Sequence, residues 1–259
     1  CDETSVAVIK DGKLLSNAVS TQIAMHRKYG GVMPEIASRL HNENITIVLK
    51  EALDQAKIKL NELDAVAVTR GPGLIGALHV GLQAAKTLAL IYHLPLIPVH
   101  HLAAHIYASE YVAQFKFPLL SLVVSGGNTE LVYMKEHLNF KIIGETKDDA
   151  IGECFDKVAR VLGLPYPGGV PIDNLAKQGK HTYQLPLPLR GKGYDFSYSG
   201  LKTAVINLVN QEKMKKRTIN IPDLCRSFED TAVKMVVDKT IKAAREYDVK
   251  LTVMRPAIK

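Results

Sequence analysis

Cysteine is scarce in this sequence, and long apolar runs are missing from it. The three cysteines among 259 residues are widely separated, so they form neither a disulfide framework nor a Cys-x-x-Cys metal pair. The longest apolar stretches, such as 88–92 and 119–124, are far shorter than the roughly 20 residues that a membrane-spanning helix needs. The opening Cys-Asp-Glu also lacks the basic and then apolar pattern of a secretory signal. We therefore expect a cytoplasmic protein of a reducing compartment, without membrane attachment.

The charge balance is basic. Lysine and arginine outnumber aspartate and glutamate by 33 to 26, which gives a formal net charge of +7. Such a surface permits an anionic partner such as RNA, although many basic enzymes bind no nucleic acid. The densest basic cluster consists of Lys213, Lys215, Lys216 and Arg217. It is either a solvated loop between helices or part of an RNA contact.

The apolar periodicity alternates between strand and helix in two successive stretches. In the first, strands are predicted at 5–9, 14–15, 64–68 and 95–99, and helices at 34–53, 75–92 and 101–111. In the second, strands are predicted at 119–124, 129–133, 141–143 and 250–254, and helices at 149–162, 172–178, 200–209 and 222–247. Each stretch opens with adjacent strands and continues as α/β. This outline is typical of the two-lobed actin-like ATPases, although doubly wound sheets share much of it. We expect lobes at 1–115 and 116–259.

Three glycine turns suggest a nucleotide cleft. The segment 123–129 places Gly126 and Gly127 between two strands, where backbone N–H groups could face a phosphate. The segment 71–73 separates a strand from a helix, and the turn 166–169 is followed by Asp173, a possible ribose ligand. Each turn by itself is better interpreted as a plain connection. Their occurrence together in one α/β chain favours the nucleotide interpretation.

Two histidines have the spacing of a metal pair. His101 and His105 are four residues apart in a predicted helix, so their rings share one face. They are either two ligands of an incomplete metal site or ordinary hydrogen-bonded histidines. The run is His-Leu-Ala-Ala-His, without the glutamate of His-Glu-x-x-His, so a metallopeptidase would lack its general base.

Eight segments in chain order carry a resemblance to one family. They are residues 1–5, 26 with 29–39, 69–76, 99–105, 124–129, 152–157, 166–169 and 195–202. Together they resemble the TsaD family, the catalytic subunits that form threonylcarbamoyladenosine in tRNA. The resemblance extends over residues 1–254.

The resemblance implies a fold, an activity and a set of site residues. The fold is the two-lobed actin-like ATPase (ASKHA) fold. The activity is transfer of the threonylcarbamoyl group from threonylcarbamoyl-AMP to the exocyclic amine of the adenosine 3′ of the anticodon, in tRNAs that read ANN codons. His101 and His105 match ligands of one divalent metal ion, iron or zinc, and Glu3 matches an acidic catalytic residue near the reacting end. The residues that match the donor-binding positions are Val123, Val124, Ser125, Gly126, Gly127, Asp156, Gly169 and Asp173. The implied partners are tRNA, a TsaB-like protein and a TsaE-like ATPase.

The sequence departs from the family pattern at two places. Asn128 stands where a histidine is usual. The family also continues past the strand near Met254 into a Gly-Gly-Val-x-x-Asn turn and an aspartate that is the third metal ligand, whereas only Arg-Pro-Ala-Ile-Lys follows here. We therefore expect a truncated second lobe and a metal site without its carboxylate. The alternatives are a degenerate, non-catalytic nucleotide-binding homologue that acts as a partner or scaffold, and a sugar or acid kinase of the same fold.

Overall fold

A computed structural model describes residues 2–191 and 193–257, with only the backbone described at 255–257. The chain divides into two compact units, Cys1–Ala104 and His105–Lys259, and the division falls inside helix α4 (His101–Tyr107). The sequence predicts the division near residue 115, after this helix.

The first unit begins with a hairpin of strands β1 (Glu3–Lys10) and β2 (Lys13–Thr21). Asp11 and Gly12 form its turn, both with positive φ, as expected for an Asp-Gly pair. Helix α2 (Pro34–Ala56) packs against the hairpin, where Val8, Ala18, Val48 and Ala52 form a small core. The proline at its first position suits a helix start, because its missing N–H would have no partner there. The short helix α1 (Ile23–Arg27) between β2 and α2 was not predicted.

The rest of the first unit is a βαβ crossover. Strands β3 (Val66–Gly71) and β4 (Leu96–His100) are parallel, and helix α3 (Ile75–Tyr92) connects them. Neighbouring parallel strands need such a crossover, because a tight turn between them would make the second strand antiparallel to the first. The short 3-10 helix η1 (Leu60–Glu62) precedes β3. The predicted turn at 71–73 lies between β3 and α3, as its glycines indicated.

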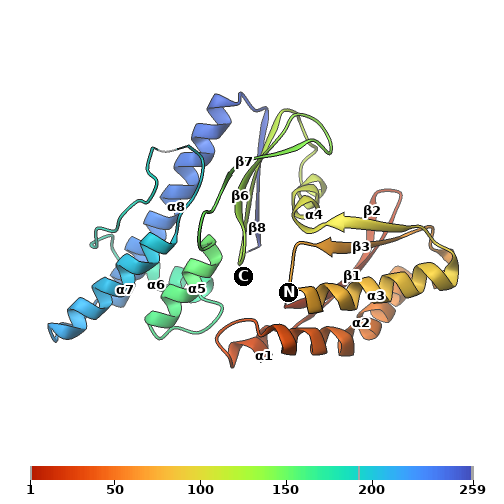
Figure 1. The fold of residues 1–259 in the computed structure, drawn as a ribbon, viewed down its shortest axis with the longest axis horizontal. Coiled ribbons are helices and arrows are strands. Elements are labelled where there is room, and N and C mark those ends of the chain that lie inside the picture. The colour runs from red at the N-terminus through yellow and green to blue at the C-terminus, as the bar shows by residue number, and fades with distance from the viewer. Residues whose placement is uncertain (1, 192, 258–259) are drawn as a thin grey trace. The chain divides into compact units, whose positions relative to one another are not determined.

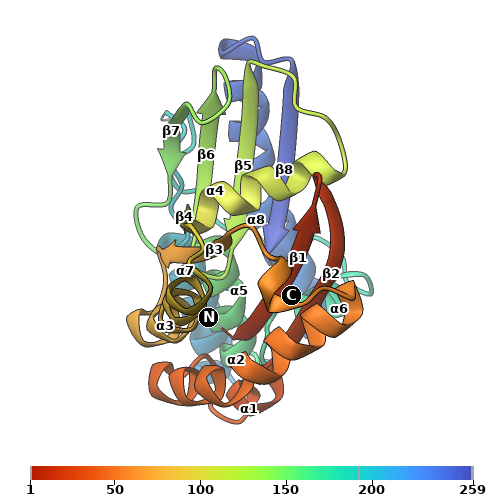
Figure 2. The same cartoon turned by 90° about the vertical axis from the view of Figure 1, so that its right-hand side faces the viewer.

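The second unit is built on a four-stranded sheet (Figure 1), whose strand order β7-β6-β5-β8 can be followed in Figure 2. Strands β5 (Leu119–Ser125), β6 (Thr129–Met134) and β7 (Phe140–Glu145) form an antiparallel meander, and β8 (Leu251–Ala257) joins β5 in parallel. Strand β5 is buried along nearly its whole length, as its uninterrupted apolar sequence predicts for a central strand. The 3-10 helix η2 (Ala108–Tyr111) follows α4.

Four helices make the core of the second unit with β5 and β6. They are α5 (Ile151–Val161), α6 (Gly169–Ala176), α7 (Ser199–Met214) and α8 (Ile221–Glu246). One continuous cluster joins them, with Leu122, Phe155, Leu201 and Phe228 among its buried members. No helix in the described ranges is long and apolar enough to cross a membrane.

Candidate functional site

The glycine turn at the end of β5 is closed by two hydrogen bonds. The Ser125 N–H donates to the Asn128 carbonyl at 2.8 Å, and the Asn128 N–H donates to Ser125 Oγ at 2.9 Å. Val123 and Val124 before it are buried, whereas Gly126 and Gly127 are exposed. Asn128 serves the turn through its backbone, so the usual histidine is not needed to close it.

Helix α5 begins directly against this turn. A Cβ at Gly152, in the first turn of α5, would lie 2.8 Å from the Ser125 carbonyl oxygen and 2.9 Å from Gly126 Cα. The preceding amide, at Ile151, donates to the buried Thr129 hydroxyl at 3.0 Å. The positive end of the α5 dipole is therefore next to the two exposed glycines, an arrangement that favours an anion.

Asp156, on α5, holds the glycine turn at 166–169 against that helix. Its Oδ1 accepts the Gly168 N–H at 2.7 Å, and a Cβ at Gly168 would lie 2.6 Å from Ala159 Cβ. Gly169 then begins α6, which carries Asp173. Asp173 is paired with Lys177 at 2.5 Å. The donor-binding residues expected from the resemblance are thus all in the second unit, on β5, the turn that follows it, α5 and α6.

Two aspartates that the sequence analysis assigned no role hold this arrangement. Asp148 accepts the Tyr198 N–H at 2.7 Å and the Ser199 N–H at 3.1 Å, and so caps the start of α7. Asp149, whose side chain is only 13% exposed, bridges Lys157 of α5 at 2.8 Å and Lys202 of α7 at 2.6 Å. The Asp-Asp doublet before a helix was the available signal, but its partners at the start of α7 are about fifty residues away.

The two expected metal ligands lie on α4. His101 and His105 are half-buried, one helical turn apart, while Leu102 and Ile106 are buried beside them. His100 is exposed, and its Nδ1 accepts the Ala103 N–H at 3.4 Å. In the described part of the chain, no three His, Cys, Asp or Glu side chains form a group able to hold a metal ion. Helix α4 therefore offers two imidazoles, a donor type that suits zinc and iron.

Glu3, the expected acidic residue, begins β1 in the first unit and is half-buried opposite Thr21. The motif that contains it starts at Cys1, which lies outside the described residues. The structure places Glu3 on a regular strand rather than on a loop, so its backbone position is fixed by the hairpin.

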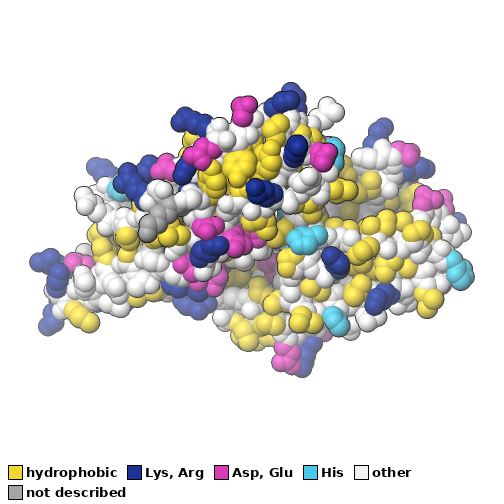
Figure 3. Space-filling view, turned by 45° about the horizontal axis from the view of Figure 1, so that its top comes forward, with side chains coloured by type: hydrophobic (Ala, Val, Ile, Leu, Met, Phe, Trp, Pro, Cys, Tyr) yellow, Lys and Arg dark blue, Asp and Glu magenta, His cyan; other side chains and the backbone are white. Residues whose placement is uncertain are grey.

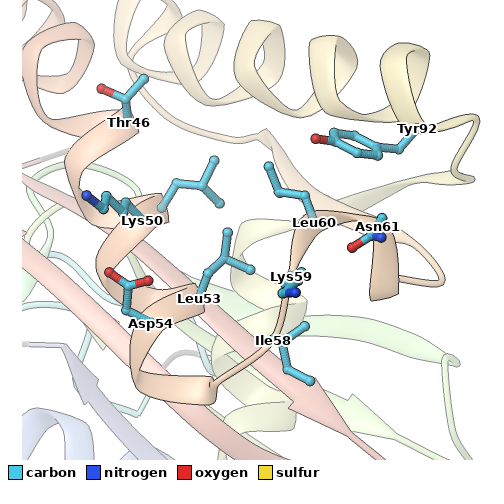
Figure 4. Close-up of a pocket in the computed structure, with 10 residues that line it drawn as sticks. Thr46, Lys50, Leu53, Asp54, Ile58, Lys59, Leu60, Asn61 and Tyr92 are labelled. Atoms are coloured by element: carbon cyan, nitrogen blue, oxygen red, sulfur yellow. The ribbon is translucent and has the colours of Figure 1, made fainter.

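A surface hollow and a basic cluster lie apart from these residues. The hollow is in the first unit, between α2, η1 and the end of α3 (Figure 4), and its lining comprises Thr46, Leu49, Lys50, Leu53, Asp54, Ile58, Lys59, Leu60, Asn61 and Tyr92. No expected site residue lines it. Lysine and arginine side chains gather at the end of α7 (Figure 3), where Lys213, Lys215, Lys216 and Arg217 are all exposed. Their exposure agrees with both interpretations left open above.

Tyr198, in the motif at 195–202, allows a first prediction. Its side chain is fully buried, and its hydroxyl has no hydrogen-bond partner among the residues that the structure describes. Burial raises the pKa of this phenol, so the hydroxyl stays neutral. Because a buried donor without a partner costs stability, Tyr198→Phe should leave the free energy of unfolding unchanged or raise it by up to about 1 kcal/mol. Chemical denaturation measures this. A loss above about 1 kcal/mol would mean that the hydroxyl has a partner.

Solved structures share this architecture. Component A of (R)-2-hydroxyglutaryl-CoA dehydratase from Acidaminococcus fermentans aligns over 98% of this chain and 78% of its own, with a TM-score of 0.55 and 14% identity. Full-length HypF, in a phosphate- and nucleotide-bound form, aligns over 83% of this chain and 35% of its own, with a TM-score of 0.55 and 14% identity. The chain has the α/β actin-like ATPase (ASKHA) fold that its sequence predicts.

Sequence relatives then identify the family within this fold class. The sequence model described as TsaD, tRNA N6-adenosine threonylcarbamoyltransferase, matches residues 13–255. Proteins of that name from Enterococcus faecalis and Geobacillus kaustophilus are each 57% identical over 96% of this chain, which spans 72% and 74% of their lengths. The chain belongs to the TsaD family, whose function is threonylcarbamoyl transfer to tRNA adenosine. The family binds a metal and acts on tRNA.

Proposed function

We propose that this chain takes its threonylcarbamoyl group from threonylcarbamoyl-AMP and holds the AMP part in the second unit. The observation that carries the proposal is the pair of exposed glycines beside α5. Neither Gly126 nor Gly127 has a positive φ, and no described heavy atom lies within 4 Å of a Cβ built on either. The described chain therefore leaves the backbone of both residues open to a group from outside it. A phosphate can approach such an uncovered backbone closely, because glycine carries no side chain.

The remaining donor-binding residues suit a nucleotide at the same place. We assign Val123 to Gly127 and the start of α5 to the phosphate, and Asp156, Gly169 and Asp173 to the ribose side. Asp156 already accepts one backbone amide, from Gly168, and a carboxylate has further lone pairs for a hydroxyl donor. The Gly168–Asp156 bond therefore fixes both the turn and the carboxylate before the donor arrives.

The reaction needs little from the protein beyond positioning and charge stabilisation, because the donor is already a mixed anhydride. The exocyclic nitrogen of adenosine attacks the carbonyl carbon, the bond from that carbon to the phosphate oxygen breaks, and AMP leaves with the electron pair. The nitrogen loses one proton to solvent. The amides near Gly126 and the start of α5 stabilise the leaving phosphate, and Glu3 acts near the reacting end.

His101 and His105 would hold one divalent metal ion, iron or zinc. When bound, such an ion supplies Lewis-acid polarisation of a carbonyl oxygen. The two imidazoles provide two ligands from one face of α4, and the part of the chain that the structure describes adds no third. We also propose a TsaB-like and a TsaE-like partner, substrates among tRNAs that read ANN codons, and a cytoplasmic location.

Changing Asp156 tests the nucleotide assignment. Asp156→Ala should weaken AMP binding about 10- to 100-fold, because it removes a charged ligand and releases the 166–169 turn; Asp156→Asn, which keeps an acceptor for Gly168, should weaken it less. Isothermal titration with AMP measures both. Asp238→Ala is the matched control, since its carboxylate is 53% exposed on α8. Unchanged AMP affinity in folded Asp156→Ala would refute the assignment. AMP binding without transfer to tRNA, with both partners supplied, would favour the non-catalytic homologue.

A further inference from the structure

The segment between α1 and α2 presents basic and aromatic side chains together. Arg27 and Lys28 are exposed, Tyr29 is 53% exposed, and Met33 is 43% exposed. The sequence from Ile23 to Pro34 contains no acidic residue, so the segment itself carries only positive charge. Exposed cations beside an exposed aromatic ring are the combination that contacts phosphates and unpaired bases.

This segment, residues 27–33, is held in one shape by a buried histidine. The His26 carbonyl accepts the Tyr29 N–H at 3.0 Å and the Gly31 N–H at 3.3 Å. The His26 ring is fully buried, and its Nδ1 accepts the Met33 N–H at 3.3 Å. Three backbone amides of the segment thus donate hydrogen bonds to His26. The exposed side chains of the segment therefore project from a fixed backbone.

The ring itself is fixed by α2. Because His26 Nδ1 accepts an amide, the ring proton is on Nε2, which donates to Gln22 Oε1 at 3.1 Å. The Gln22 amide nitrogen donates to the Ala37 carbonyl at 3.4 Å, and both residues are buried. Gly30 supplies the positive φ, 67°, at which the chain leaves α1. The chain between α1 and α2 (Figure 2) is therefore anchored on both sides.

We propose that residues 27–33 are an RNA contact of this enzyme, in which Tyr29 stacks on an unpaired base of the tRNA anticodon loop and Lys28 contacts a backbone phosphate. The proposal rests on the tRNA transfer function, not on the donor site. The target adenosine lies next to the anticodon, in single-stranded RNA, where bases are free to stack on protein side chains. A preorganised aromatic residue loses little conformational entropy on binding, which explains why a buried histidine supports an exposed loop.

The test is binding of an anticodon stem-loop RNA, measured by fluorescence anisotropy at several salt concentrations with the protein and its partners. Tyr29→Ala should weaken binding about 10-fold or more, and Tyr29→Phe should bind like the unchanged protein, because stacking needs the ring and not the hydroxyl. Lys28→Ala should lower the salt slope by about 0.7, the value for one phosphate contact on a single strand. The matched control is Tyr111→Ala, which removes a tyrosine of similar exposure, 59%, from η2.

The outcomes separate this proposal from the donor-site proposal. AMP affinity should be unchanged in all three variants at 28 and 29, whereas Asp156→Ala should change it without changing RNA affinity. Equal RNA affinity for Tyr29→Ala and the control would overturn the inference. A loss of RNA affinity in Tyr29→Phe as large as in Tyr29→Ala would also overturn it, because that result would assign the contact to the hydroxyl and not to the ring. Normal RNA binding together with weaker binding of the partner proteins would overturn it as well, because the segment would then be a protein contact.

Discussion

With His101 and His105 both changed to alanine, the protein is expected to lose metal binding and threonylcarbamoyl transfer together. Loss of an outer-shell partner alone costs about 10- to 100-fold in metal affinity, so removal of two ligands should exceed about 100-fold. Each single variant should retain part of the affinity. Competition with a chromogenic chelator measures binding, and transfer to an unmodified tRNA transcript, with the partner proteins, measures the reaction.

The expectation follows from the geometry of α4. Residues four apart lie one above the other on a helix, and the burial of Leu102 and Ile106 prevents the helix from turning that face away. His100→Ala is the matched control, because it removes an imidazole from the same segment that is exposed and bonded to the Ala103 amide. Metal retained at full stoichiometry by the double variant would show that these histidines are not ligands.

The secondary structure was predictable because most elements are long and strongly patterned. The periodicity from Ile75 to Tyr92 gives α3 with the bounds that the structure has, and left-handed residues such as Lys57 and His93 end the first unit's helices. Helix α1 was missed, since five residues are too few to show a helical period. The element order left doubly wound sheets open, the family resemblance favoured the actin-like fold, and the comparisons confirm that fold class.

The candidate site was predictable only in parts. Each glycine turn could be found locally, but the contact of Gly152 with Ser125 and the bond from Gly168 to Asp156 depend on how α5 packs. The bond from Lys202 to Asp149 could not be found, because the two residues are 53 positions apart. Long-range pairs of this kind are set by tertiary packing, and a single sequence carries no local trace of them.

Among the substitutions considered, loss of the Asp149 carboxylate should have the largest effect on stability. Asp149→Ala should lower the free energy of unfolding by about 3 kcal/mol, because it removes the carboxylate that bonds the largely buried ammonium group of Lys202. Lys157, by contrast, keeps Glu153 at 2.7 Å. Removal of one partner from a buried ion pair costs about 3 to 5 kcal/mol of unfolding free energy. The loss here should be at the lower end of that range, since the Lys157 side chain is 38% exposed. Asp238→Ala removes a carboxylate that is 53% exposed and should cost no more than about 0.5 kcal/mol. Equal losses would show that the bridge does not stabilise the fold.

The pH dependence identifies the charge as the cause. Burial alone would raise the pKa of Asp149, but the hydrogen bonds from Lys157 and Lys202 outweigh it and hold the pKa below its ordinary value. A folded pKa below the unfolded value, about 3.9, means that the contribution is present above about pH 4 and is lost as the pH falls through the folded pKa. The difference in unfolding free energy between the unchanged protein and Asp149→Asn should therefore be constant near neutral pH and shrink in acid. Because Asp149 also precedes the start of α5, where Gly152 touches the glycine turn, AMP affinity should fall in the same variant.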